Sequence, residues 1–164
     1  MKRNVLFAMT SLAVVILDQI SKLAVLRTMR VHETISVIPG FFNLVHVRNR
    51  GVAFGILNRP GGDLSYYLLI GATLLVVMFL LLWFRKISGA HGSAGFALSL
   101  VIGGAIGNLI DRIRLREVVD FLDLYIGSFH WPAFNVADSA VSVGSIWLAF
   151  LLLRHGNGKE RQGG

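Results

Sequence analysis

Four long apolar stretches constrain the fold of this chain more than any other feature. They cover about residues 5–26, 64–84, 94–112 and 132–153. A helix needs roughly 20 consecutive apolar residues to cross a bilayer. Only 15% of the residues are charged, whereas a soluble domain carries about 25%. The sequence therefore predicts an α-helical integral membrane protein with four transmembrane helices.

The residue types present exclude several kinds of chemistry. The chain has no cysteine, so neither a thiolate nucleophile nor a cysteine-bound metal can form. No two histidines have the i, i+4 spacing that binds metal on a helix, and we expect no metal and no other cofactor. The net charge of +7 does not indicate nucleic-acid binding, because the basic residues cluster at the ends of the apolar stretches, where they would meet lipid headgroups.

Four crossings place both termini on the same side of the membrane. The segments on that side are almost purely basic, since every acidic residue except Glu160 lies on the other side. We therefore expect cytoplasmic termini. Residues 1–155 are predicted to form a single membrane-embedded domain, and the polar, glycine-rich residues 156–164 a disordered cytoplasmic tail.

A small extracytoplasmic β-unit is predicted between the first two spans, at about residues 32–58. Residues 34–37 alternate between polar and apolar, Pro39 and Gly40 offer a turn, and residues 41–48 alternate again. This pattern is typical of antiparallel strands joined by a tight connection.

Polar side chains are costly inside a membrane and usually mark function. Here they gather at the outer ends of three spans and in the loop after the third. Asp18 and Lys22 have i, i+4 spacing, and we interpret them as a structural ion pair. Asp123 is expected to face solvent. The other candidates in this region are Asn108, Asp111, Arg112, Asp120, Asn135 and Asp138.

Asp120 and Asp138 differ from the other candidates because neither has an evident structural reason for its position. Asp120 lies within an apolar run, and Asp138 lies in the first turns of a predicted membrane helix without a basic residue nearby. Two carboxyl groups that share a site retain one proton between them, which suits them to acid–base catalysis. Which of the two holds the proton is left open, because such a pair titrates jointly.

Five short motifs resemble the prolipoprotein signal peptidases, the signal peptidase II family. In chain order they are DQISK at 18–22, NRGVAF at 49–54, GNLIDR at 107–112, VVDF at 118–121 and FNVADS at 134–139. The resemblance implies a bacterial inner-membrane aspartic endopeptidase, with its active site near the extracytoplasmic face and with Asp120 and Asp138 as its catalytic residues. It implies supporting or substrate-binding roles for Asn49, Gly51, Asn108, Asp111, Arg112 and Asn135.

The same resemblance implies a substrate and an inhibitor. The enzyme would remove the signal peptide of a prolipoprotein, cutting before a cysteine that carries diacylglyceryl. Cyclic peptide antibiotics such as globomycin would inhibit it, and we expect a monomer. The main alternative is a small proton-coupled transporter, although carriers bind near the bilayer midplane and these polar residues gather at one rim. A scaffold without chemistry would leave Asp120 and Asp138 unexplained.

Overall fold

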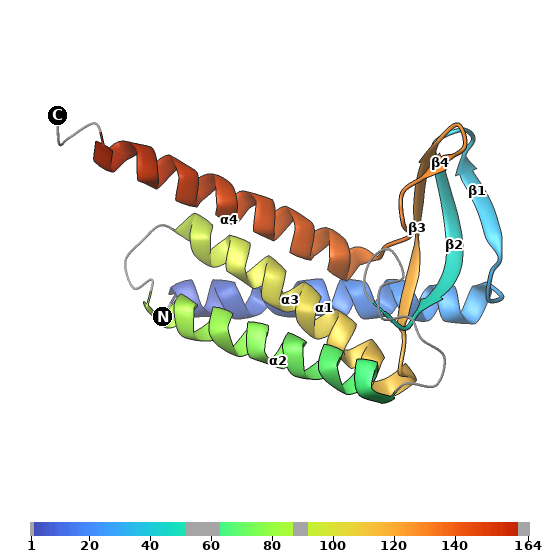
Figure 1. Ribbon diagram of the computed structural model, residues 1–164, viewed down its shortest axis with the longest axis horizontal. Coiled ribbons are helices and arrows are strands. Elements are labelled where there is room, and N and C mark those ends of the chain that lie inside the picture. Colours follow the sequence, from blue (N-terminus) through green and yellow to red (C-terminus); the bar gives the residue numbers. More distant parts are fainter. Residues whose placement is uncertain (1, 52–62, 87–91, 161–164) are drawn as a thin grey trace.

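A computed structural model describes residues 2–51, 63–86 and 92–160. It contains four long helices: α1 (Lys2–Thr28), α2 (Asp63–Lys86), α3 (Gly92–Leu115) and α4 (Val136–Glu160). Each is long and apolar enough to cross a membrane. The helices run side by side, a small sheet lies across one end of them, and both termini lie at the opposite end (Figure 1). The predicted four-span architecture is confirmed.

Helix α3 is the centre of the bundle and packs on α1, α2 and α4. Glycines on two sides of α3 allow close approach of its neighbours. A Cβ atom on Gly103 would lie 2.8 Å from the Ser11 carbonyl oxygen of α1, and one on Gly104 would collide with the Ala137 carbonyl oxygen of α4. These glycines therefore serve packing, as small residues do between membrane helices.

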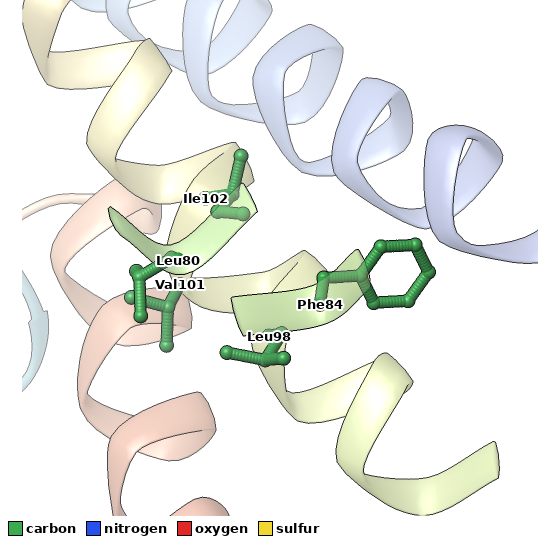
Figure 2. Close-up of a cluster of buried hydrophobic side chains, with 5 residues drawn as sticks. All are labelled: Leu80, Phe84, Leu98, Val101 and Ile102. Carbon is green, nitrogen blue, oxygen red and sulfur yellow. The ribbon is translucent and has the colours of Figure 1, made fainter. Parts of the chain in front are cut away.

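Apolar packing holds α2 against α3. Leu80 and Phe84 of α2 are buried against Leu98, Val101 and Ile102 of α3 (Figure 2). The opposite side of α2 keeps many large apolar side chains exposed, as expected for a surface that faces lipid.

The sheet contains two strands that were predicted and two that were not. β1 (Thr34–Ile38) and β2 (Phe42–Asn49) pair antiparallel, as expected, with Gly40 at φ 82° in their turn. β3 (Val118–Ile126) and β4 (Phe129–His130) come from the segment between α3 and α4, and complete an antiparallel sheet of order β1-β2-β3-β4. Residues 52–58 of the predicted β-unit lie outside the described residues.

The ends of α4 correct two expectations. The helix begins at Val136 rather than at residue 132, because Phe134 is still bonded to the sheet: its N–H donates to the Leu122 carbonyl, and its own carbonyl accepts from the N–H groups of Phe121 and Leu122. The predicted disorder of the tail is wrong for residues 156–160, which continue the helix to Glu160. No proline in that segment interrupts the backbone hydrogen bonds. Residues 161–164 lie outside the described part of the chain.

Candidate active site

A buried ionic cluster lies where α1 meets α3. Lys22 is only 2% exposed. Its Nζ atom lies 2.9 Å from Asp18 Oδ2, 2.8 Å from Asp111 Oδ2 and 2.9 Å from Asn108 Oδ1. The predicted pairing of Asp18 with Lys22 is confirmed, and Asp111 joins it as a second carboxylate on the same ammonium group.

Both carboxylates of this cluster also fasten the elements that carry the remaining site residues. The N–H of Ala137, in the first turn of α4, donates to Asp18 Oδ1 at 2.9 Å, an interaction that the helix dipole also favours. The N–H of Val119 in β3 donates to Asp111 Oδ2 at 3.2 Å. The ionic cluster therefore fixes the start of α4 and the start of β3 relative to α1 and α3.

Asn135 links the two candidate catalytic aspartates. It caps α4, because its Oδ1 accepts the N–H of Asp138 at 2.9 Å while its own N–H donates to Asp138 Oδ2 at 3.3 Å. Such reciprocal bonds are the capping-box arrangement. Its Nδ2 donates to Asp120 Oδ1 at 2.8 Å. One fully buried asparagine thus bonds to both carboxyl groups.

Two further amides complete the hydrogen bonding of the aspartates. Asn49 Nδ2 donates to Asp120 Oδ2 at 3.1 Å, and Asn108 Nδ2 donates to Asp138 Oδ1 at 2.8 Å. The backbone N–H of Gly51 donates to Asn49 Oδ1 at 2.9 Å and so orients that amide. Within the described residues, neither aspartate forms an ion pair with lysine or arginine; neutral amides surround them instead.

The environment of Asp120 favours its protonated form. Burial raises the pKa of Asp120 to about 7, and the nearby charge of Asp138 acts in the same direction. The hydrogen bonds from Asn49 and Asn135 and the charge of Lys22 oppose this rise. A carboxyl group with this pKa exchanges its proton near neutral pH, which is what a general acid or base requires.

Both aspartates line a cavity of about 630 Å³ between the sheet and α4. One part of its wall is polar and the rest mostly apolar. The polar side chains beside the aspartates are Asn49, Asn108 and Arg112. The apolar wall is formed by Val118, Leu124, Trp131, Pro132, Ala133, Phe134, Val141 and Val143, with Ser139 and Ser142 on α4 and Gly51 at the edge. Such a cavity can hold an extended peptide beside an apolar group.

Comparison with known proteins gives the family. The sequence matches the model of signal peptidase II, described as "Signal peptidase (SPase) II", over residues 10–154. The chain belongs to the signal peptidase II family. It is 48% identical to the lipoprotein signal peptidase of Syntrophotalea carbinolica over 131 residues, 80% of each chain. It is 42% identical to that of Geobacter metallireducens over 149 residues, 91% of each chain.

A solved structure agrees with this assignment. A bacterial membrane enzyme determined by the in meso method at 2.3 Å resolution superposes with a TM-score of 0.82 at 35% identity, covering 93% of this chain and 90% of that one. Signal peptidase II enzymes are aspartic peptidases, and the chain is accordingly an aspartic peptidase and a multi-pass membrane protein of bacterial type.

The arrangement of the site distinguishes two groups among the predicted residues. Asn49, Gly51, Asn108, Arg112, Asp120 and Asp138 line the cavity, whereas Asp18, Lys22, Asp111 and Asn135 lie behind it and hold the first group in place. In this signal peptidase II fold, Asn49 and Asn108 each donate one N–H of the side-chain amide to an aspartate.

The sequence analysis did not identify Gln19 as part of the site, and it predicted the wrong environment for Asp123. Gln19 donates through Nε2 to Asp111 Oδ1 at 2.9 Å; its place between Asp18 and Lys22 in the first motif was the available signal. Asp123 was expected to face solvent, which is wrong. It is 7% exposed and accepts a hydrogen bond from Asn43 Nδ2 at 2.9 Å, because the segment that contains it forms a strand rather than an open loop.

Proposed function

We propose that Asp120 and Asp138 are the catalytic pair of this peptidase. The observation that carries this proposal is their environment: both carboxyl groups line one cavity, and both are bonded to neutral amides rather than to a cation among the described residues. An ion pair would hold a carboxylate in its charged form. Amides orient the carboxyl group and leave it able to gain and lose a proton.

The hydrolysis follows from one proton shared by two carboxyl groups. The ionised aspartate takes a proton from a water molecule, whose oxygen attacks the scissile carbonyl carbon. The protonated aspartate donates a hydrogen bond to the carbonyl oxygen and stabilises the charge that develops there. The C–N bond then breaks, and the leaving nitrogen takes a proton from the pair. Arg112, which lines the cavity, is the group placed to bind a carbonyl of the substrate backbone.

The substrate class follows from the family. Its membership makes the protein a lipoprotein signal peptidase, which removes the signal peptides of prolipoproteins. We propose in addition that it cuts before a cysteine that carries diacylglyceryl. The apolar wall from Trp131 to Phe134 and the facing residues of α4 give the acyl chains an apolar surface beside the aspartates. Each buried CH₂ group contributes about 0.8 kcal/mol to such binding.

The test of this function is cleavage by the purified protein in detergent. Two precursors are compared that differ only in diacylglyceryl on the cysteine. We expect the lipidated precursor to be cut directly before that cysteine, as measured by mass spectrometry, and the other precursor to be cut much more slowly. Equal rates would contradict the lipid requirement. The proton-coupled transporter, the alternative function, predicts cleavage of neither.

The proposed topology places the sheet outside the cytoplasm. Both termini lie at the end of the bundle away from the sheet (Figure 1), and the basic residues Arg85 and Lys86 lie at the end of α2. These features support cytoplasmic termini and a catalytic pair near the extracytoplasmic face of the bacterial inner membrane. Single cysteines introduced at Ser88 and Gly127 can be labelled without background, since the chain has none. Reaction of an impermeant external reagent at Gly127 only is the expected result; reaction at Ser88 would reverse the topology.

The cavity is also the proposed binding site of cyclic peptide inhibitors such as globomycin. It offers the same polar pair and apolar wall to an inhibitor as to a substrate. We expect globomycin to compete with the lipidated precursor and to protect a thiol introduced at Ser142, on the α4 wall. We propose that the monomer suffices for activity, because one chain supplies both aspartates and the described amides that donate to them.

A further inference from the structure

One wall of the cavity is a short segment without regular structure. Residues 131–134 lie between β4 and the cap of α4, and all four line the cavity. The Trp131 N–H donates to the Leu124 carbonyl at 2.8 Å, and the Phe134 N–H donates to the Leu122 carbonyl at 3.0 Å. Pro132 has no N–H to donate. The backbone bonds of this segment are therefore concentrated at its two ends.

A side-chain cluster lies behind the first of these ends. The imidazole of His130, the residue before Trp131, places Nδ1 at 2.9 Å from Asp123 Oδ1 and at 3.0 Å from Asp123 Oδ2. Asn43 Nδ2 donates to Asp123 Oδ2 at 2.9 Å. Asp120 and Leu124 face the cavity, and side chains alternate along a strand, so Asp123 lies on the opposite face of β3. The cluster does not touch the cavity that receives the substrate.

Aromatic stacking adds a second contact to the same histidine. The rings of His130 and Tyr125 are nearly parallel, 6° apart in plane and 4.8 Å apart between centroids. The Tyr125 hydroxyl in turn accepts the N–H of Gly40, in the β1–β2 turn, at 2.8 Å. We refer to Asn43, Asp123, Tyr125 and His130 as the clasp. It joins β4 to β2, β3 and the β1–β2 turn.

We infer that the clasp is a substrate-positioning device: it fixes the wall of residues 131–134 from behind and thereby sets the affinity for the apolar part of the substrate. This inference rests on the proposed function, since the cavity must be the substrate site. The catalytic pair is held separately, by Asn49, Asn108 and Asn135. Loosening the clasp should therefore weaken substrate binding and leave the chemical step unchanged.

His130→Phe tests this inference most selectively, because phenylalanine keeps a ring to stack on Tyr125 and removes the donor to Asp123. With a fluorescent peptide that carries a diacylglyceryl cysteine, we expect KM to rise several-fold, because a loosened wall must be ordered again each time the substrate binds. The kcat value should stay within about twofold, since no group on the reacting atoms changes. His32→Asn is the matched control: it removes another exposed histidine beside the sheet, and neither kinetic constant should change.

A second measurement is independent of catalysis. A thiol introduced by Ala133→Cys reports on the wall, and a water-soluble maleimide should modify it several-fold faster in the His130→Phe background than with His130 intact.

Asp123→Asn is a second variant, for the case that His130→Phe fails to fold. It keeps the shape and most hydrogen bonds of the clasp, and it should change KM and the labelling rate in the same direction but by less. Unchanged KM, a fall in kcat alone, or equal labelling rates would each overturn the inference. The cleavage rate of Asp120→Asn tests the proposed catalytic pair separately from the clasp. Activity in that variant contradicts the proposed catalytic pair, whereas the labelling rates still decide the role of the clasp.

Discussion

Two pairs of aspartates lie close together in this molecule and differ in what surrounds them: Asp18, Asp111 and Asp120 are buried, and Asp138 is half-buried. Asp18 and Asp111 share the ammonium group of Lys22, with N–O distances of 2.9 and 2.8 Å. Asp120 and Asp138 line a cavity and accept hydrogen bonds from asparagine amides. The same residue type is thus paired with a cation in one region and surrounded by neutral amides in the other.

Asn108 marks the boundary between the two regions. Its Oδ1 accepts a hydrogen bond from Lys22 at 2.9 Å, and its Nδ2 donates to Asp138 at 2.8 Å. Because the ammonium group can only donate, it fixes which end of the amide faces Asp138. One region of the molecule therefore builds the site, and the other performs its chemistry.

The largest expected effect on stability is that of Lys22→Met. It leaves Asp18 and Asp111 buried without a cation, and breaking a buried ion pair in this way costs about 3–5 kcal/mol. We expect a large fall in the thermal unfolding temperature in detergent. Adding Asp18→Asn to this variant should restore only part of the loss, because Asp111 remains uncompensated.

Lys86→Met is the matched control for that variant. Lys86 is exposed at the end of α2, and its replacement should leave the unfolding temperature within about 1 °C of the wild type, since exposed charges contribute little. If Lys22→Met were as stable as this control but inactive, Lys22 would belong to the catalytic region.

The second-largest expected effect is a gain in stability, from Asp120→Asn. The pKa of Asp120 is raised to about 7, against about 4 in an unfolded chain. Between these values the folded state binds more protons than the unfolded state, so stability falls as the pH rises from about 4 to about 7. Asp120→Asn removes this penalty and should raise the stability by up to about 4 kcal/mol above pH 7, less the cost of an unfavourable amide contact with Asn49.

The unfolding temperatures of Asp120→Asn and wild type at pH 8 and at pH 4 measure this effect. The gain should be present at pH 8 and nearly absent at pH 4. A variant less stable than wild type at pH 8 would show that Asp120 supports the fold, as Asp18 and Asp111 do.

The smallest expected effect on stability is that of Gly107→Ala, which adds a Cβ atom beside the ionic cluster. A Cβ atom on Gly107 would lie 2.6 Å from Asp18 Oδ2, and Asp18 cannot move away because Lys22 and Ala137 hold it. Gly107→Ala should destabilise the protein by about 1–3 kcal/mol, as overpacking does. Gly71→Ala is the control on α2, where nothing lies within 4 Å of the added atom; it should stabilise slightly, because alanine favours helix. Equal behaviour of the two variants would mean that the cluster is loosely packed.

The sequence predicted the helices and most of the site because their signals are local. Apolar runs of about 20 residues identify spans, and the i, i+4 spacing of Asp18 and Lys22 places them on one face of one helix. The pairing of Lys22 with Asp111 requires α1 and α3 to pack in a particular register, about 90 residues apart in the chain, which no local pattern encodes.

Strand β3 shows more clearly that local sequence patterns do not encode contacts between distant segments. Residues 118–126 carry Asp120 and Asp123 three residues apart within an apolar run, and this spacing does not alternate as an exposed strand would. Their strand forms through pairing with β2, as in the alignment of Val47 with Asp120. That nonlocal pairing also buries Asp123, and the bridge between Leu122 and Phe134 delays the start of α4 to Val136. The sequence alone predicted neither feature.

The measurement that tests the central claim most directly compares cleavage of a lipidated precursor by Asp120→Asn, Asp138→Asn and the double variant, each purified and shown by thermal unfolding to be folded. If the two aspartates share one proton in one catalytic unit, each single substitution lowers the rate by about 10³-fold or more, and the double variant is no slower than either single variant. Substantial cleavage by one single variant, or losses that multiply in the double variant, would contradict the account.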